Sequence, residues 1–306
     1  MKKSWKFGKH SDSNKAASFW QGFRVTALAA PNRSVGARLF LLIIAGILVC
    51  VLLLGIFSYN KSSSIIQNKV ADANALTAEQ TSGRLNLLLQ NYEQKMIQIT
   101  MDMNFTAMLN AIAISTDEVV KSYNASKIRE YFYQFTAADE TVDSVSLYPL
   151  EGQVKAISTN GLITSELLSQ FPYISKIQEA RGELVWVPTM PNGIDGQQNI
   201  PTFAVGKLLD YIVPYVLIVE IRYNALDREL KNVQFGESGA AYVVSDEGKI
   251  VYTQDTSLLG TDYPYPIPSE PQVINIGGVQ SLSTASKVEL NGWTMIGNIP
   301  VAEFVK

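Results

Sequence analysis

The longest apolar run in the sequence lies near the N-terminus. Residues 39–57 contain no charge and no proline, and fifteen of these nineteen residues are Leu, Ile, Val or Phe. A helix rises about 1.5 Å per residue, so the run spans roughly 28 Å, close to the ~30 Å hydrocarbon core of a bilayer. The pattern predicts a transmembrane helix over residues 39–59, and the alternative is a helix buried in the core of a soluble protein.

Charge is distributed unevenly around this run. Residues 1–38 carry eight Lys or Arg against one acidic residue, Asp12, whereas the rest of the chain is acidic. Lys and Arg close to a spanning helix stay in the cytoplasm. The sequence therefore predicts a cell-membrane protein with a basic cytoplasmic tail over 1–38 and with residues 60–306 outside the cell. A cleaved signal peptide is the alternative, but residues 57–60 offer no convincing cleavage site.

Beyond the membrane run, apolar residues recur at steps of three and four, which is one face of a helix. They are Leu85, Leu88, Leu89, Tyr92, Met96, Ile99 and Met103. The pattern predicts a long helix over residues 60–104 that rises from the membrane. We expect residues 85–103 to dock on the chain's own domain and residues 62–80 to form the seam of a homodimer.

After residue 123 the pattern changes to short runs of apolar and β-branched residues separated by turns. The first set of strands is expected at 142–148, 154–157, 183–188, 202–209 and 215–223, with helical stretches at 165–180 and 224–230. The second set is expected at 241–244, 250–253, 273–276, 280–287 and 293–299, again with a helical start at 301–305. The fold class is therefore α+β, with two antiparallel-sheet modules in tandem over 105–230 and 231–306.

Composition excludes several kinds of chemistry. The single Cys and the single His, His10, exclude a disulfide framework, a thiolate metal cluster and Ser-His-Asp catalysis. The net charge of −3 gives no reason to expect nucleic acid. We expect no enzymatic activity, no metal and no cofactor. An anchored extracellular enzyme and a purely structural anchored binding protein remain as alternatives.

Several motifs resemble one family of bacterial receptors. They are Arg-Ser-Val-Gly-Ala-Arg-Leu-Phe at 33–40, Ser-Val-Ser-Leu-Tyr-Pro at 144–149, Glu-Leu-Val-Trp at 183–186, Tyr-Val-Val-Ser-Asp-Glu-Gly at 242–248 and Asn-Gly-Trp-Thr-Met-Ile-Gly at 291–297. Together with the spanning helix and the tandem modules, they resemble the double-Cache (tandem PAS-like) extracellular sensor of transmembrane receptors. Residues 34–61 resemble the N-terminus of Gram-positive methyl-accepting chemotaxis receptors.

The resemblance implies a sensor for chemotaxis signalling. A small molecule, or a binding protein loaded with it, would act on the membrane-distal Cache module at 105–230, above a membrane-proximal module at 231–306. A helix displacement would then cross the membrane to a HAMP relay and a signalling rod. The chain carries no such output domain, so we expect a fragment or a shortened receptor. A membrane histidine kinase or a cyclic-dinucleotide enzyme is the alternative output.

The candidate ligand residues follow from what a pocket requires, namely aromatic walls and a few aimed polar groups. They are Arg129, Tyr131, Tyr133, Tyr148, Trp186, Phe203, Lys207 and Asp210. Trp186 would cap a ligand or fill the core, and Lys207 with Asp210 would meet a ligand or form a solvated pair. Glu220 and Arg222 are expected to pair across the sheet. The amino-acid-binding members of the family present an Arg-x-Trp-Tyr run that this chain lacks, so the ligand class stays open.

Overall fold

The computed structural model describes residues 35–151, 155–160, 171–194, 196 and 199–304, without the side chain of Ala37. The chain divides into two compact units, Met1–Ile65 and Ile66–Lys306. Helix α2 (Val35–Met101) is 67 residues long. Within the described part of the chain it is the one helix long and apolar enough to cross a membrane, and none of its most apolar window is buried. This exposure differs from that of a core helix in a soluble protein.

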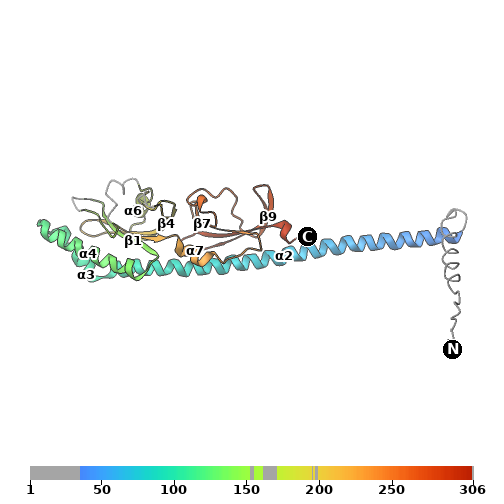
Figure 1. Cartoon of the computed structure of the whole chain (residues 1–306), viewed down its shortest axis with the longest axis horizontal. Helices are drawn as coiled ribbons and strands as arrows, with labels where there is room; N and C mark the ends of the chain where they lie inside the picture. The colour runs from blue at the N-terminus through green and yellow to red at the C-terminus, as the bar shows by residue number, and fades with distance from the viewer. Residues whose placement is uncertain (1–34, 152–154, 161–170, 195, 197–198, 305–306) are drawn as a thin grey trace, which may run out of the picture. The chain divides into compact units, whose positions relative to one another are not determined.

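The second unit contains two antiparallel sheets of five strands each (Figure 1). The first has the order β2-β1-β5-β4-β3, from strands β1 (Val142–Pro149), β2 (Ile157–Ser158), β3 (Leu184–Met190), β4 (Thr202–Leu209) and β5 (Tyr215–Arg222). The second has the order β7-β6-β10-β9-β8, from strands β6 (Ala240–Val244), β7 (Ile250–Thr253), β8 (Gln272–Ile276), β9 (Val279–Lys287) and β10 (Thr294–Pro300). The predicted α+β fold, a long helix followed by two tandem PAS-like modules, is confirmed.

The apolar stripe of α2 packs against both sheets as one continuous core. Leu85, Leu89, Tyr92, Met96 and Ile99 are all at most 2% exposed, which confirms the expected docking of this segment. Met103 is 85% exposed, contrary to its place in the predicted stripe. The reason is that α2 ends at Met101. Asp102 caps the start of a new helix, so Met103 no longer continues the buried stripe of α2.

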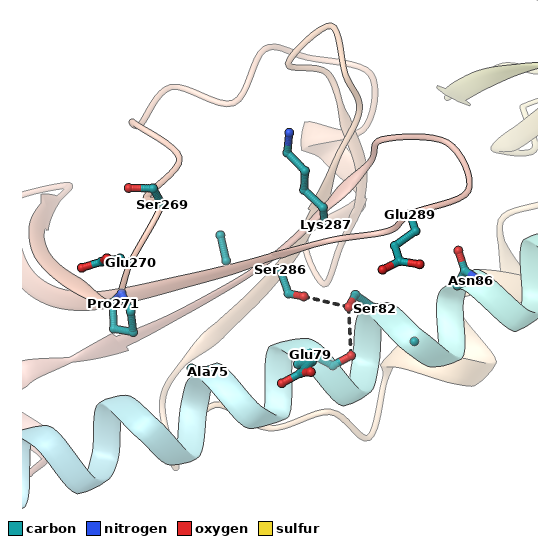
Figure 2. Close-up of a pocket in the computed structure, with 12 residues that line it drawn as sticks. Ala75, Glu79, Ser82, Asn86, Ser269, Glu270, Pro271, Ser286, Lys287 and Glu289 are labelled. Atoms are coloured by element: carbon teal, nitrogen blue, oxygen red, sulfur yellow. Dashed lines mark hydrogen bonds between the residues drawn. The ribbon is translucent and has the colours of Figure 1, made fainter.

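Docking of α2 begins closer to its N-terminus than expected, in the small and polar middle of the helix. Asn74, Ala78 and Ser82 are buried, so the upper part of the proposed dimer seam at 62–80 lies against the chain's own unit. Small side chains let the helix approach β9 closely: the Ser82 and Ser286 hydroxyl oxygens are 2.8 Å apart (Figure 2). The backbone N–H of Leu290 donates to Asn86 Oδ1 at 2.9 Å.

Two helices were not predicted as such, α3 (Met103–Ile114) and α4 (Glu118–Ala138). The expectation of β-structure directly after residue 123 is wrong, because residues 123–138 are helical. Aspartates begin both helices: Asp102 Oδ1 accepts from the N–H of Asn104 at 2.7 Å, and Asp117 Oδ1 accepts from that of Val119 at 2.8 Å. The buried face of α4 is narrow, only Ile128 and Phe132, which explains why its period was missed.

The remaining short elements follow the predicted order. The first hairpin pairs Ser146 with Ser158, and β2 overlaps the expected strand at 154–157 only at Ile157; residue 154 is outside the described residues. Helix α6 (Ile174–Glu179) lies inside the expected helical stretch at 165–180, whose residues 165–170 are outside the described residues. Helix α7 (Asn224–Leu230) has the predicted bounds. The 3-10 turns η1 (Thr256–Leu258) and η2 (Val301–Glu303) belong to the second module.

Candidate functional site

The two faces of the first sheet have different surroundings. Alternate residues of β5, such as Leu217 and Val219, belong to the core that contains α2, and we call this the inner face. Val216 and Ile218 point to the opposite side, the outer face, where Tyr148 and Ile177 of α6 join them in a separate cluster. Helix α6 lies directly on β4, because Ile177 Cδ1 occupies the space that a Cβ at Gly206 would need. Helix α6 therefore covers this part of the outer face.

A buried carboxylate occupies one end of the outer face. Glu220 of β5 is 0% exposed. Its Oε1 accepts from the Thr202 hydroxyl at 2.6 Å and from the Ile194 backbone N–H at 2.9 Å, and its Oε2 accepts from the Ser144 hydroxyl at 2.9 Å. The three donors come from three separate segments of the chain. The fold thus aims neutral donors at one acid from strands β1 and β4 and from the loop after β3.

The electrostatics of Glu220 are those of an uncompensated acid. Burial raises the pKa of this carboxyl, and its three hydrogen bonds oppose the shift. No Lys, Arg or His forms an ion pair with it among the residues that the structure describes. The nearby Arg222 is instead paired with Asp143, Nε to Oδ1 at 2.8 Å. The expectation that Glu220 and Arg222 find partners across the sheet is confirmed.

More polar groups continue along the outer face from Glu220. The hydroxyl oxygens of Ser146 and Ser158 are 2.7 Å apart, and both residues are buried. Tyr148 follows on the same side of β1 and is 1% exposed. The outer face therefore combines an acid, a row of hydroxyls and an aromatic ring in one buried layer.

Of the predicted ligand residues, Tyr148 alone lies on the outer face. Trp186 and Phe203 lie on the inner face, with ring centroids 6.2 Å apart, and Trp186 Nε1 donates to Glu93 Oε1 of α2 at 3.0 Å. Both are core residues, so they cannot wall one pocket with Tyr148. The physical reason is strand alternation, since neighbours on β3 and β4 point to opposite faces and both faces are buried.

Lys207 and Asp210 do not meet. The Lys207 ammonium donates to the carbonyl oxygen of Gly182, and Asp210 is exposed beyond the end of β4. These two residues form no ion pair with each other.

Arg129, Tyr131 and Tyr133 lie on α4, away from the outer face. Tyr131 packs between Phe105 and Phe135, and its partial burial raises its pKa to about 12. The Tyr133 hydroxyl donates to the Thr159 carbonyl at 2.8 Å. Arg129 lines a separate cavity together with Lys155 and Ile157.

The cover of the outer face is also tied to the second module. Lys176 of α6 lies 3.1 Å from Asp246 Oδ2 and 3.0 Å from Glu247 Oε1, in the turn between β6 and β7. The Tyr173 hydroxyl donates to Glu247 Oε2 at 3.1 Å. At the end of β3, the buried Thr189 hydroxyl donates to the carbonyl of Val251 in β7 at 2.7 Å. Helix α6 and the residue before it are thus linked by direct contacts to the turn between β6 and β7.

The groove between α2 and β9 is less suited to a ligand. It has a volume of about 620 Å³, and Glu79, Glu270 and Glu289 lie along it. These carboxylates are spread apart and converge on no common point (Figure 2). Among the described residues, no group of three His, Cys, Asp or Glu could hold a metal ion.

Sequence reasoning did not single out Glu220, Ser144, Ser146 or Thr202 as candidate site residues. A signal was present, because Glu220 is the one acid within the apolar strand Tyr215–Arg222. Ser144 and Ser146 alternate with Val145 and Leu147, which is the pattern of a strand with one polar face.

No protein-family model matches the sequence, and no curated protein matches it. Solved structures match the fold. The ligand-binding domain of the Pseudomonas aeruginosa PAO1 amino acid chemoreceptor PctC, in complex with GABA, is 16% identical with a TM-score of 0.53, over 75% of this chain and 99% of that domain. The ligand-binding domain of the Pseudomonas fluorescens chemoreceptor CtaA, in complex with L-isoleucine, is 13% identical with a TM-score of 0.54, over 78% of this chain and 95% of that domain.

A sensor kinase shares the same fold. The sensor domain of the V. cholerae histidine kinase DctB is 12% identical with a TM-score of 0.53, over 76% of this chain and 98% of that domain. The chain therefore has the Cache-type fold of the ligand-binding sensor domains of chemoreceptors and sensor histidine kinases.

Proposed function

We propose that this chain is the extracellular ligand-sensing region of a bacterial transmembrane chemoreceptor. A small molecule, free or delivered by a binding protein, binds the outer face of the first sheet, in the membrane-distal module at 105–230. The observation that carries the proposal is Glu220, a fully buried acid with three neutral hydrogen-bond donors, on a face covered by α6. The membrane-proximal module at 231–306 relays the change.

The chemistry of Glu220 favours a ligand with a cationic group. A cation placed beside this carboxylate compensates a charge that the protein leaves unpaired, and it lowers the raised pKa of the group. Tyr148 supplies an aromatic wall on the same face. GABA and L-isoleucine, the compounds in the PctC and CtaA complexes, both carry an ammonium group. The proposed ligand site is therefore formed by Tyr148, Ser144, Ser146, Thr202 and Glu220.

Transmission follows from the contacts of α6. A ligand shifts the conformational equilibrium only if it binds one arrangement of the outer face better than another. Such a difference moves α6, and the bridge from Lys176 to Asp246 and Glu247 passes the change to the second sheet. Helix α2, whose residues 74–99 pack on the shared core, carries it toward the membrane. Coupling free energies of this kind are typically ~1–3 kcal/mol.

Orientation, assembly and output complete the proposal. The basic N-terminal tail lies in the cytoplasm, and the apolar run 39–59 spans the cell membrane. Two copies associate through the part of the seam at 62–80 that precedes Asn74. The choice of chemotaxis over a kinase or cyclase output depends on the resemblance of residues 34–61 to chemotaxis receptors. A chimera that carries residues 1–306 in front of a chemoreceptor's second spanning helix, HAMP relay and rod tests this directly. Ligand-dependent change in receptor methylation supports the proposal, and a ligand that binds without changing methylation contradicts it.

A thermal-shift screen identifies the ligand. The full chain in nanodiscs is tested against amino acids, amines, organic acids, purines and sugars, and a ligand at 100 times its Kd adds about 2.7 kcal/mol of stability. Glu220→Gln should abolish the shift, whereas Glu183→Gln, an exposed acid of the same module, should preserve it. A shift that survives Glu220→Gln unchanged would place the ligand elsewhere.

A further inference from the structure

A separate cavity lies between α3, α4 and the edge strand β2, on the side of the first sheet away from the outer face. Its volume is about 340 Å³, within the range of small-molecule pockets. Ile112 of α3 and Ile157 of β2, both 2% exposed, form part of an apolar lining.

One face of α4 supplies the polar side of this cavity. Ser122, Ser126 and Arg129 are spaced by four and three residues, so they lie in a row along the helix, and all three line the cavity. Lys155, just before β2, contributes a second cation from the sheet edge. Two hydroxyls and two cationic side chains thus surround a space with an apolar lining.

The positive charge in the cavity is not balanced by the protein. Lys121 also lines it but is paired with Glu118 at 2.8 Å, which neutralises both. Arg129 and Lys155 form no ion pair and no hydrogen bond with any residue that the structure describes. Both cationic side chains are exposed, so a soluble anion can reach them.

We propose that this cavity binds a small organic dianion, namely a short dicarboxylate. The planar guanidinium of Arg129 holds one carboxylate with two parallel hydrogen bonds, supported by the Ser122 and Ser126 hydroxyls. Lys155 holds the second carboxylate as a point charge, and the methylene groups lie on Ile157. The site is distinct from the outer face and does not depend on the ligand proposed there.

Calorimetric titration of the full chain in nanodiscs with succinate tests the site. Succinamide, which has the same skeleton and no charge, is the ligand control. Succinate should bind and succinamide should not. Arg129→Gln and Lys155→Gln should each weaken succinate binding by more than about tenfold, because each removes a charge-assisted contact.

Lys127→Gln is the matched control, since this exposed cation of α4 is paired with Glu130 at 2.8 Å instead of lining the cavity. It should leave succinate binding unchanged, and so should Glu220→Gln on the outer face. The proposal is overturned if wild-type protein binds no succinate, if Lys127→Gln weakens binding as much as Arg129→Gln, or if inorganic phosphate binds more tightly than succinate. The proposal is also overturned if Glu220→Gln loses succinate binding while Arg129→Gln and Lys155→Gln keep it. That result would assign succinate to the outer face.

Discussion

The two modules have the same strand order but differ in what their outer faces contain. In the first, Glu220 lies two residues before the end of the last strand, and in the second Asn298 occupies the equivalent place. Each is paired with the first strand of its own sheet, Glu220 with Ser144 and Asn298 with Ala240. One scaffold thus presents a buried acid in one module and a buried neutral amide in the other.

The covers of the two faces differ as well. The corresponding face of the second sheet, which carries Asn298 and Tyr242, is filled by the chain's own tyrosines. Asn298 Nδ2 donates to the Tyr263 hydroxyl at 3.1 Å, and the Tyr263 ring lies 5.3 Å from that of Tyr242. Burial raises the pKa of Tyr263. The first face is covered by α6, a short helix held by polar contacts to another module. We infer that the first module carries the ligand chemistry and the second the mechanical coupling.

The largest effect is expected where the two modules meet in their shared core. Trp186 stands 5.9 Å from Trp293 of the second module, ring centroid to centroid. Trp186→Ala should destabilise the protein by about 3–5 kcal/mol, because it opens a cavity in a core shared by both modules. Chemical denaturation measures this loss. A cost below about 1 kcal/mol would mean that Trp186 is a pocket wall after all.

Exchanging the chemistry of the outer faces is expected to have the next largest effect. Asn298→Asp places a carboxylate in a site that is 4% exposed, and the Asn298 Oδ1 atom has no hydrogen-bond partner among the described residues. We expect a loss of about 1–3 kcal/mol at pH 8 and a much smaller loss at pH 4, where the acid is protonated. Equal losses at both pH values would show that steric fit, not charge, distinguishes the two modules.

The opposite substitution, Glu220→Gln, removes the buried acid from the first module. Its effect on the free energy of unfolding should depend on pH. A folded-state pKa raised above the ordinary 4.5 means that stability is full below 4.5 and falls as pH rises through the folded value. Each unit of difference corresponds to about 1.4 kcal/mol. Glu220→Gln should therefore match wild type near pH 4 and exceed it in free energy of unfolding at pH 8. Parallel pH profiles for the two proteins would contradict the raised pKa.

The smallest effect on stability is expected at the bridge between the modules. Lys176 and its partners Asp246 and Glu247 are 38–47% exposed, so Lys176→Ala should cost no more than about 1 kcal/mol. Its effect on signalling should be larger, since it cuts the link from α6 to the second sheet. In the receptor chimera, the variant should bind ligand normally and change methylation less. Lys127→Ala, an exposed pair on α4, is the control.

The elements of the sheets could be predicted from the sequence, whereas of the proposed site only Tyr148 was predicted. Strand β4 has the predicted bounds because apolar alternation and turn residues mark it locally. The direction of Trp186 could not be predicted, because Val185, Trp186 and Val187 are all buried and periodicity assigns no face to such a strand.

The environment of Glu220 is a tertiary property. Its partners Ser144 and Thr202 lie 76 and 18 residues away in the sequence, so no local pattern brings them together. Helix α4 was missed for a different reason. Its buried residues are few and its aromatic residues are common in strands, so its composition favoured the wrong element.

Hydrogen–deuterium exchange of the full chain in nanodiscs, with and without the tightest ligand from the screen, is the most direct test. If the ligand occupies the outer face of the first sheet, protection should rise in β1, β5 and α6, and exchange should also change in the turn between β6 and β7. Protection confined to the tyrosine-filled face of the second sheet, with α6 unchanged, would contradict the division of roles between the two modules.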